Sequence, residues 1–206
     1  MAFYKNFYLR FGKRAFDICA ALLGMCVIFP FICIVAACIA LSRTGPVFFS
    51  QERMGRDFKR FKLHKFRTMV VNAQTMGPQI TKGTDARITK IGRFLRNTKL
   101  DELPQLLNVL KGDMSIVGPR PEVEKYVLLF KDKYEKILSI RPGITDYATI
   151  EYRDEQDVLN RYEDTVQGYV NDVLPAKIEL YEKYLREMDF ITDLKIIVLT
   201  ARRIFF

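Results

Sequence analysis

The stretch ICAALLGMCVIFPFICIVAACIAL, residues 18–41, contains 24 consecutive residues without a charged side chain. A helix needs about 20 apolar residues to cross a bilayer, so this run is long enough to do so. Lys13 and Arg14 precede the run, and Arg43 follows it. Because basic residues are enriched on the cytoplasmic side of a membrane segment, the flanking charges predict that both ends of the run lie on the cytoplasmic side.

Pro30, near the middle of the run, suggests how both ends can lie on one side. Proline lacks a backbone N–H, and its ring clashes with the carbonyl four residues earlier, so helices bend or break there. We therefore expect a re-entrant helix–break–helix that turns at Pro30 and leaves the membrane by the face it entered. A single span is the main alternative, since spanning helices also contain proline. A cleaved signal peptide fits poorly, because the apolar core is too long.

The composition limits the remaining classes of function. The net charge of +9 suits anionic lipid headgroups, nucleic acid or a phosphorylated substrate. All four cysteines lie inside the apolar run, so a soluble disulfide or a four-thiolate metal site is not expected. His64 is the only histidine, which excludes a two-histidine zinc site. Residues 1–43 are expected to form the membrane anchor, and residues 44–206 are long enough for one domain with its own core.

The first part of this domain is expected to contain a β-hairpin. Two segments rich in aromatic residues, 47–51 and 58–66, flank turn residues 54–57. In the second strand, apolar residues alternate so that one face should carry Phe61, Leu63 and Lys65.

Helical patterns follow the hairpin. Residues 88–96 have apolar positions at helical spacing. Thr98 is expected to cap the next helix, with Asp101 at the position of a capping-box acid. That helix should tolerate Pro104 in its first turn and end at Gly112. Its expected buried stripe consists of Leu100, Leu103, Leu106, Leu107 and Leu110.

The C-terminal half is also expected to be mostly helical. Residues 122–138 predict one helix, and residues 157–187 predict one or two helices with a boundary at Pro175. A short strand is expected over residues 145–152. The last helix, 190–206, is amphipathic and can either lie in the headgroup plane of a membrane or cover the core. Its apolar stripe consists of Ile191, Leu194, Ile197, Val198, Ala201, Ile204 and Phe205.

These patterns together predict an α+β, mainly helical fold. It combines an N-terminal re-entrant membrane helix–break–helix, a small β-hairpin and surface amphipathic helices.

Asp101 and Glu102 are adjacent acids at a predicted helix start. Acids in this position often only complement the helix dipole. Several basic residues are expected nearby, however, and arginines held between rigid turns suit phosphate recognition. Two carboxylates among such cations could hold Mg²⁺ together with substrate phosphates. The basic residues are Lys65, Arg67, Arg93, Arg96, Lys99, Arg120 and Arg141.

Six segments resemble the bacterial sugar transferase family, from about Phe11 to Ile204. They resemble in particular its small monotopic polyprenyl-phosphate phosphoglycosyl transferases. The most specific segment is LDELPQLLNVLKGDMS at residues 100–115. The others are KRAFD at 13–17, Pro30, FKLHKFRTM at 61–69, VGPRP at 117–121 and RPGIT at 141–145.

The resemblance implies a mechanism and a set of site residues. Asp101 would attack the sugar-linked phosphorus of a nucleoside diphosphate sugar, with uridine the favoured base, and would release UMP. Polyprenyl phosphate, such as undecaprenyl phosphate, would then take the phosphosugar from Asp101. Mg²⁺ would bind at Asp101, and Glu102 would position the metal or the second nucleophile. Phosphate contacts are expected from Lys65, Arg96, Arg120 and Arg141, and a nucleotide contact from Thr145.

The resemblance also implies a location. The catalytic domain would lie on the cytoplasmic face of a bacterial inner membrane, anchored monotopically and touching anionic headgroups. There it would carry out the first membrane step in assembling an O-antigen, a capsule or a glycoprotein glycan.

Two positions depart from the family pattern. Phe29 stands where many members have serine, and Asp146 stands where many have glycine. Asp146 can either contact substrate or cap a turn.

Two other classes of protein remain as alternatives. A non-catalytic membrane-anchored module that binds phosphate or lipid would use Asp101 as a helix cap. A nucleic-acid-binding protein is suggested by charge alone, and no reader motif supports it. No nucleic-acid partner is therefore expected.

Overall fold

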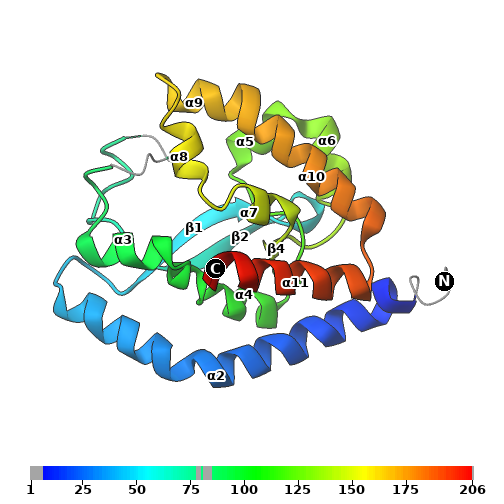
Figure 1. Ribbon diagram of the computed structural model, residues 1–206, viewed down its shortest axis with the longest axis horizontal. Coiled ribbons are helices and arrows are strands. Elements are labelled where there is room, and N and C mark those ends of the chain that lie inside the picture. Colours follow the sequence, from blue (N-terminus) through cyan, green and yellow to red (C-terminus); the bar gives the residue numbers. More distant parts are fainter. Residues whose placement is uncertain (1–6, 78–79, 81–84, 206) are drawn as a thin grey trace.

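The structure is a computed structural model that describes residues 7–77, 80 and 85–205. The apolar run forms helix α2, Lys13–Leu41, which continues from the π-helical turn η1, Tyr8–Gly12. Figure 1 shows α2 along one side of the molecule, with helices α5 (Glu124–Leu129), α6 (Lys131–Ile137), α9 (Thr165–Gly168) and α10 (Leu174–Glu187) on the opposite side. Within the described residues, the helix through Tyr8–Leu41 is the one that is long and apolar enough to cross a membrane.

Helix α2 is continuous through Pro30, so the predicted break in the helix is wrong. In Figure 1, α2 instead curves around the rest of the molecule, as long helices do when they wrap a core. Ala21, in the first half of α2, is fully buried, and Ile39, in the second half, is 1% exposed. Both halves therefore dock on the same domain, which supports the helix where Pro30 lacks a hydrogen-bond donor. The re-entrant path through a membrane stays a prediction.

The predicted β-hairpin is confirmed. Strands β1, Phe48–Met54, and β2, Arg60–Phe66, pair antiparallel, with the short 3-10 turn η2, Arg56–Phe58, between them. Leu63 of β2 is buried against α2 and helix α4, Gln105–Lys111. Residues 61, 63 and 65 share one face of the strand, so Lys65 points to the same side as Leu63.

A second, smaller sheet was not predicted. Strands β3, Ser115–Val117, and β4, Gly143–Thr145, pair in parallel. The strand expected over residues 145–152 is wrong, since helix α7, Tyr147–Glu151, follows β4 directly. Asp146 causes the change, because its side chain accepts a hydrogen bond from the Thr149 N–H at 2.7 Å and so caps the helix.

The central helices depart from prediction at their ends. Helix α3, Lys90–Asn97, is confirmed, but Thr98 caps its C-terminus instead of opening the next helix. A 3-10 turn, η3, Leu100–Glu102, comes first, and helix α4 spans Gln105–Lys111. Gly112 ends α4 with a φ of +92°, as expected. In the leucine stripe, Leu106 is buried, but Leu107 is 43% exposed and Val109 takes its place in the core.

The remaining helices enclose the main core. The single helix expected over residues 122–138 is split at Phe130 into α5, Glu124–Leu129, and α6, Lys131–Ile137. The chain then forms α8, Glu155–Leu159, α9, Thr165–Gly168, the π-helical turn η4, Tyr169–Val173, and α10, Leu174–Glu187. The boundary expected at Pro175 is therefore a π-helical turn within one helical stretch. The core between these elements includes Val127, Tyr134, Leu174 and Tyr181.

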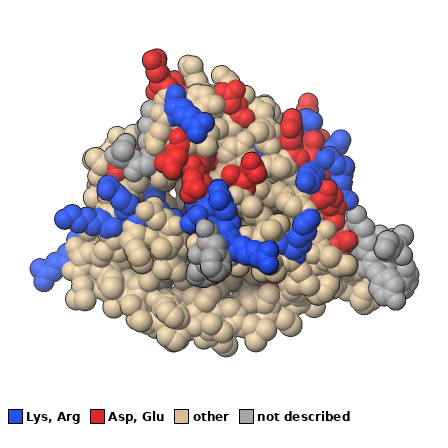
Figure 2. Space-filling view, in the orientation of Figure 1, with Lys and Arg blue, Asp and Glu red and all other residues tan. Residues whose placement is uncertain are grey.

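Helix α11, Phe190–Phe205, covers the core with a face that the sequence did not indicate. Asp193 and Ile196 are fully buried, whereas Ile191 is 75% exposed and Val198 is 51% exposed. Much of the predicted apolar stripe therefore points outward. Figure 2 shows that the side of the molecule formed by α2 carries no charged residues in this view, and that a row of Lys and Arg residues borders it.

Candidate active site

Asp101 and Glu102 lie in η3, the single turn between α3 and α4. The chain enters this turn through Lys99, which has a left-handed backbone conformation with a φ of 57°. That conformation costs a non-glycine residue about 1 kcal/mol and persists only when the surroundings hold it in place. Leu100 and Leu103 provide this support by packing on the cluster around Ile39 of α2.

Glu102 is held by two cations. Lys65 Nζ lies 2.8 Å from Glu102 Oε1, and Arg120 forms a bidentate pair with both carboxylate oxygens, with Nη1 3.0 Å from Oε2. The Glu102 side chain is only 13% exposed. Burial opposes its ionised form, but Arg120 and Lys65 outweigh burial and hold the pKa of Glu102 well below its usual range.

Asp101 has the opposite electrostatic environment. It is 6% exposed, and burial raises the pKa of its carboxyl group. The charge of Lys65 lowers this pKa, and the neighbouring Glu102 raises it further. Adjacent carboxyl groups whose pKa values are pushed apart commonly have different chemical roles. Here Glu102 is an ionised anchor for cations, while Asp101 is a buried carboxyl group with a raised pKa.

Two more cations complete the surroundings of the acids. Arg96 of α3 donates from Nε to Thr68 Oγ1 at 2.9 Å, and Lys99 donates from Nζ to the Arg153 carbonyl at 3.0 Å. Burial lowers the pKa of both side chains, and the negative charge of Asp101 opposes this shift. The structure thus brings together three of the predicted site residues, Lys65, Arg96 and Arg120, around the acid pair. Lys99 joins them, although only its position beside the pair in the sequence pointed to it.

Asp146 holds the backbone of Arg120 in place. Its carboxylate accepts the Arg120 backbone N–H at 3.3 Å while it caps α7. Asp146 is 1% exposed, so the structure favours the capping role over direct contact with substrate.

Arg141 and Thr145 are not part of this group. Arg141 donates from Nε to the Gly112 carbonyl at 2.8 Å, at the far end of α4, where Arg14 binds the Val109 and Leu110 carbonyls. The Thr145 hydroxyl lies 2.6 Å from that of Thr200 on α11. Substrate contacts from Arg141 and Thr145 stay predictions.

The oxygen donors near the acid pair suit Mg²⁺. Among the residues that the structure describes, no group of three or more His, Cys, Asp or Glu side chains could hold a metal ion. Mg²⁺ does not need three protein ligands, because it commonly binds one or two carboxylates together with substrate phosphates. The carboxylate of Asp101 can serve in this way, whereas both Glu102 oxygens are paired with cations. Gln105, four residues after Asp101, adds a buried amide whose oxygen and nitrogen have no hydrogen-bond partner in the described part of the chain.

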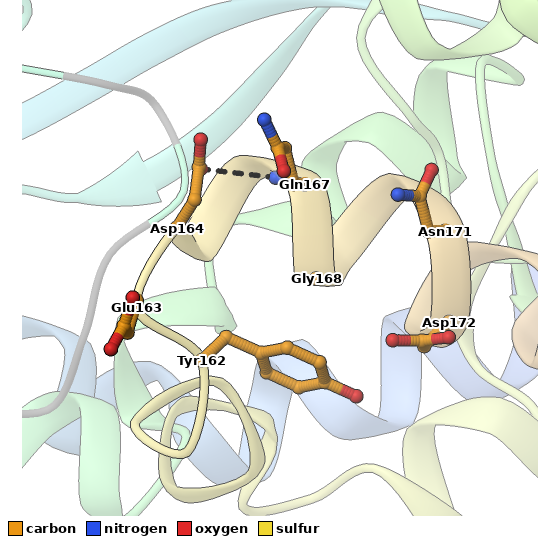
Figure 3. Close-up of a pocket in the computed structure, with 7 residues that line it drawn as sticks. All are labelled: Tyr162, Glu163, Asp164, Gln167, Gly168, Asn171 and Asp172. Atoms are coloured by element: carbon orange, nitrogen blue, oxygen red, sulfur yellow. Dashed lines mark hydrogen bonds between the residues drawn. The ribbon is translucent and has the colours of Figure 1, made fainter.

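A separate pocket of about 200 Å³ opens beside α9 and η4. Figure 3 shows Tyr162 lying across it, with Asp164 and Glu163 at one end and Asp172 at the other. Its acidic lining would repel an anionic sugar nucleotide, so this pocket is a poor candidate for the active site.

Comparison with known proteins identifies the class. The bacterial sugar transferase family matches residues 8–206, and the chain belongs to this family. This confirms the resemblance seen in the sequence.

Three individual relatives are similar to this chain over most of its length. A UDP-glucose:undecaprenyl-phosphate glucose-1-phosphate transferase of Escherichia coli (strain K12) is 39% identical over 201 residues, which cover 93% of this chain and 40% of that protein. A UDP-N-acetylgalactosamine-undecaprenyl-phosphate N-acetylgalactosaminephosphotransferase of Aeromonas hydrophila is 34% identical, over 94% of this chain and 44% of that protein. The uncharacterized sugar transferase EpsL of Bacillus subtilis (strain 168) is 38% identical, over 93% of this chain and 86% of that protein. The chain thus spans less than half of the first two relatives and most of the third.

Proposed function

We propose that this chain is a phosphoglycosyl transferase that moves a sugar phosphate from a UDP-sugar to a polyprenyl phosphate such as undecaprenyl phosphate. The observation that carries the proposal is that Asp101 and Glu102, although adjacent, have different contacts and electrostatic environments. Glu102 holds Lys65 and Arg120 in place, and Asp101 stays beside them as a separate carboxyl group. The names of the Escherichia coli and Aeromonas hydrophila relatives support this choice of substrates.

In the first step, Asp101 acts as the nucleophile. A carboxylate oxygen of Asp101 attacks the phosphorus that carries the sugar, and the bond from this phosphorus to the bridging oxygen breaks. UMP leaves with that oxygen and its electron pair, and the sugar phosphate remains on Asp101. Lys65, Arg96 and Arg120 bind the phosphate oxygens during this exchange. Mg²⁺ bound at Asp101 would offset charge on the diphosphate.

In the second step, an oxygen of the polyprenyl phosphate attacks the same phosphorus. The bond between this phosphorus and Asp101 breaks, which restores the carboxylate and gives a polyprenyl diphosphosugar. The attacking phosphate is already ionised, so the step does not require a strong general base. Such a product would begin the assembly of a membrane-linked glycan.

The polyprenyl acceptor requires the site to lie at a membrane surface. We infer that residues 1–43 form a re-entrant anchor, in which the unbroken, curved helix α2 enters and leaves the membrane by the same face, and that residues 44–206 lie on the cytoplasmic face of the bacterial inner membrane. Asp17, at the start of α2, accepts a hydrogen bond from the Ser115 hydroxyl at 2.9 Å, while Ile39, near the other end, packs on Phe66. Both ends of α2 touch one domain, which supports re-entry over a span. The row of basic residues in Figure 2 would face anionic headgroups.

The alternative of a non-catalytic binding module is less well supported. It requires Asp101 to serve as a helix cap, but the residue before η3 is Lys99, the residue before α4 is Pro104, and neither helix start has a side-chain cap.

Asp101→Asn provides the direct test of the nucleophile. We expect the purified variant to fold but to release UMP from a UDP-sugar at least a thousandfold more slowly than the unsubstituted protein, because an amide cannot form the covalent adduct. Asp132→Asn, at an exposed position on α6, is the matched control and should keep full activity. Equal UMP release by Asp101→Asn and the control would remove Asp101 as the nucleophile.

A further inference from the structure

Gln105 is a buried polar residue close to the acid pair in the sequence, and the proposed mechanism leaves it without a role. It is the first residue of α4 and is 1% exposed. Neither its amide oxygen nor its amide nitrogen has a hydrogen-bond partner in the described part of the chain. Burying an unpaired polar group costs about 1–3 kcal/mol, so a leucine at this position would give a more stable protein. An unpaired amide that is kept at such a cost indicates that another group pairs with it.

The backbone places Gln105 on the same side of the chain as Asp101. Leu103 (φ −52°, ψ −37°) and Pro104 (φ −61°, ψ −15°) continue the helical path from the 3-10 turn η3 into α4, so residues 101, 105 and 108 share one face. Because side chains on a helix lean toward its N-terminus, we expect the Gln105 amide to point back over the turn that contains Asp101.

Asn108 shows what this face contacts. Its side chain accepts a hydrogen bond from the His64 N–H at 3.0 Å and donates to the Lys62 carbonyl at 2.8 Å. The shared face therefore points at the edge of β2. Lys65, next along β2, donates from Nζ to Glu102 Oε1 at 2.8 Å, so the acid pair borders the same strand. Gln105 thus lies between the anchored Asn108 and the acid pair.

We propose that the Gln105 side-chain oxygen is the second protein ligand, with Asp101, of the divalent cation at the active site. This inference rests on the proposed function. Amide and carboxylate oxygens are the ligands that Mg²⁺ accepts, and a helix spacing of four residues brings the two together. Glu102 is a less suitable ligand for the cation, because Lys65 and Arg120 already pair with both of its carboxylate oxygens.

Direct cation binding tests this assignment without relying on turnover. The full chain in detergent is titrated with Mn²⁺ as the probe, and free Mn²⁺ is measured by electron paramagnetic resonance. Gln105→Leu should weaken Mn²⁺ binding at least tenfold while its melting temperature stays equal or rises. Gln105→Glu keeps an oxygen at the same place and should bind Mn²⁺ at least as tightly as the unsubstituted protein. Gln167→Leu, at the exposed pocket of Figure 3, is the matched control and should leave binding unchanged.

The outcomes separate this inference from the proposed function. Unchanged Mn²⁺ binding by Gln105→Leu overturns the assignment of Gln105, as does an unsubstituted protein that binds no Mn²⁺. If Gln105→Leu does not fold, Gln105→Glu decides alone, because weakened binding by this variant contradicts the assignment and retained binding supports it. UMP release by Asp101→Asn tests the nucleophile independently of all these results.

Discussion

At the scale of single residues, the site depends on two neighbouring carboxyl groups with different surroundings. Glu102 is ionised because Arg120 and Lys65 outweigh the effect of its burial. Asp101 has a raised pKa because burial outweighs the cations around it. The cations that would bind substrate phosphates are thus fixed before substrate arrives, and in the proposed mechanism Asp101 would gain reactivity as a nucleophile by being desolvated.

The raised pKa of Asp101 predicts the pH dependence of the first step. In the proposed mechanism Asp101 must be ionised to attack, and its pKa lies above that of an ordinary aspartate, so activity should fall at a higher pH than usual as the solution becomes acidic. We expect the acid limb of kcat/KM for the UDP-sugar to lie clearly above the reference value of about 3.9. The measurement is UMP release across pH in the unsubstituted protein. An acid limb at or below pH 4 would contradict the environment described for Asp101.

At the scale of elements, a close approach between two glycines brings Arg120 to the acid pair. Strands β3 and β4 pair in parallel, and a Cβ added to Gly143 would lie 2.1 Å from the backbone nitrogen of Gly118. This contact joins the loop that carries Arg120 to the segment that carries Asp146, which accepts the Arg120 N–H.

Gly143→Ala should therefore disturb both stability and the site. We expect a loss of about 2–3 kcal/mol in the free energy of unfolding, because the added methyl group meets backbone atoms that cannot move aside. UMP release should also decrease as Arg120 shifts. Chemical denaturation measures the first effect, and Gly24→Ala, whose Cβ would lie 3.6 Å from Leu106, is the control that should be tolerated. Equal stability of the two variants would show that the contact between β3 and β4 is not required.

The elements also show how far the sequence predicts this fold. The hairpin and α3 follow from alternation and helical spacing, which are local properties of the chain. Strands β3 and β4 have three residues each, too few for a pattern, and their pairing joins segments more than 25 residues apart. Thr98 had the residue type of a cap but ends a helix instead of opening one, because packing of the following turn on α2 decides where the chain is helical.

The candidate site was also predictable only in part, because contacts between distant segments are not visible in the sequence. Asp101 and Glu102 were predicted from adjacent acids among basic residues, and the family resemblance gave roles to Lys65, Arg96 and Arg120. The motif could not tell that Arg141 reaches the Gly112 carbonyl, or that the Thr145 hydroxyl pairs with Thr200. Gln105 was within the quoted motif, but its missing partners become visible only when its burial is known.

At the scale of the whole molecule, α2 is attached to the domain at both ends. Near its start, Lys13 lies 2.7 Å from Asp193 of α11, and Asp17 binds Ser115 and the Ile116 N–H. Near its end, Ile39 is buried with Phe66 and Leu95. A helix that crossed the bilayer would have to lose one of these attachments, at the cost of leaving buried carboxylates or apolar side chains unpaired.

The arrangement predicts that both ends of α2 lie on the cytoplasmic side. In a variant whose four native cysteines are replaced by alanine, single cysteines are placed at Arg10 or at Thr44. A maleimide that cannot cross membranes should label neither position in intact spheroplasts and both after permeabilisation. Labelling of exactly one of the two positions in intact spheroplasts would show that the helix spans the membrane.

The most direct test of the proposed chemistry is to trap the intermediate. The protein is mixed with a UDP-sugar and Mg²⁺ in the absence of any polyprenyl phosphate, and the tryptic peptide of residues 100–111 is analysed by mass spectrometry. We predict that this peptide gains the mass of one sugar phosphate, that fragmentation places it on Asp101, and that adding polyprenyl phosphate removes it. Rapid UMP release by the complete mixture, with no sugar phosphate on Asp101 at any time, would contradict the account.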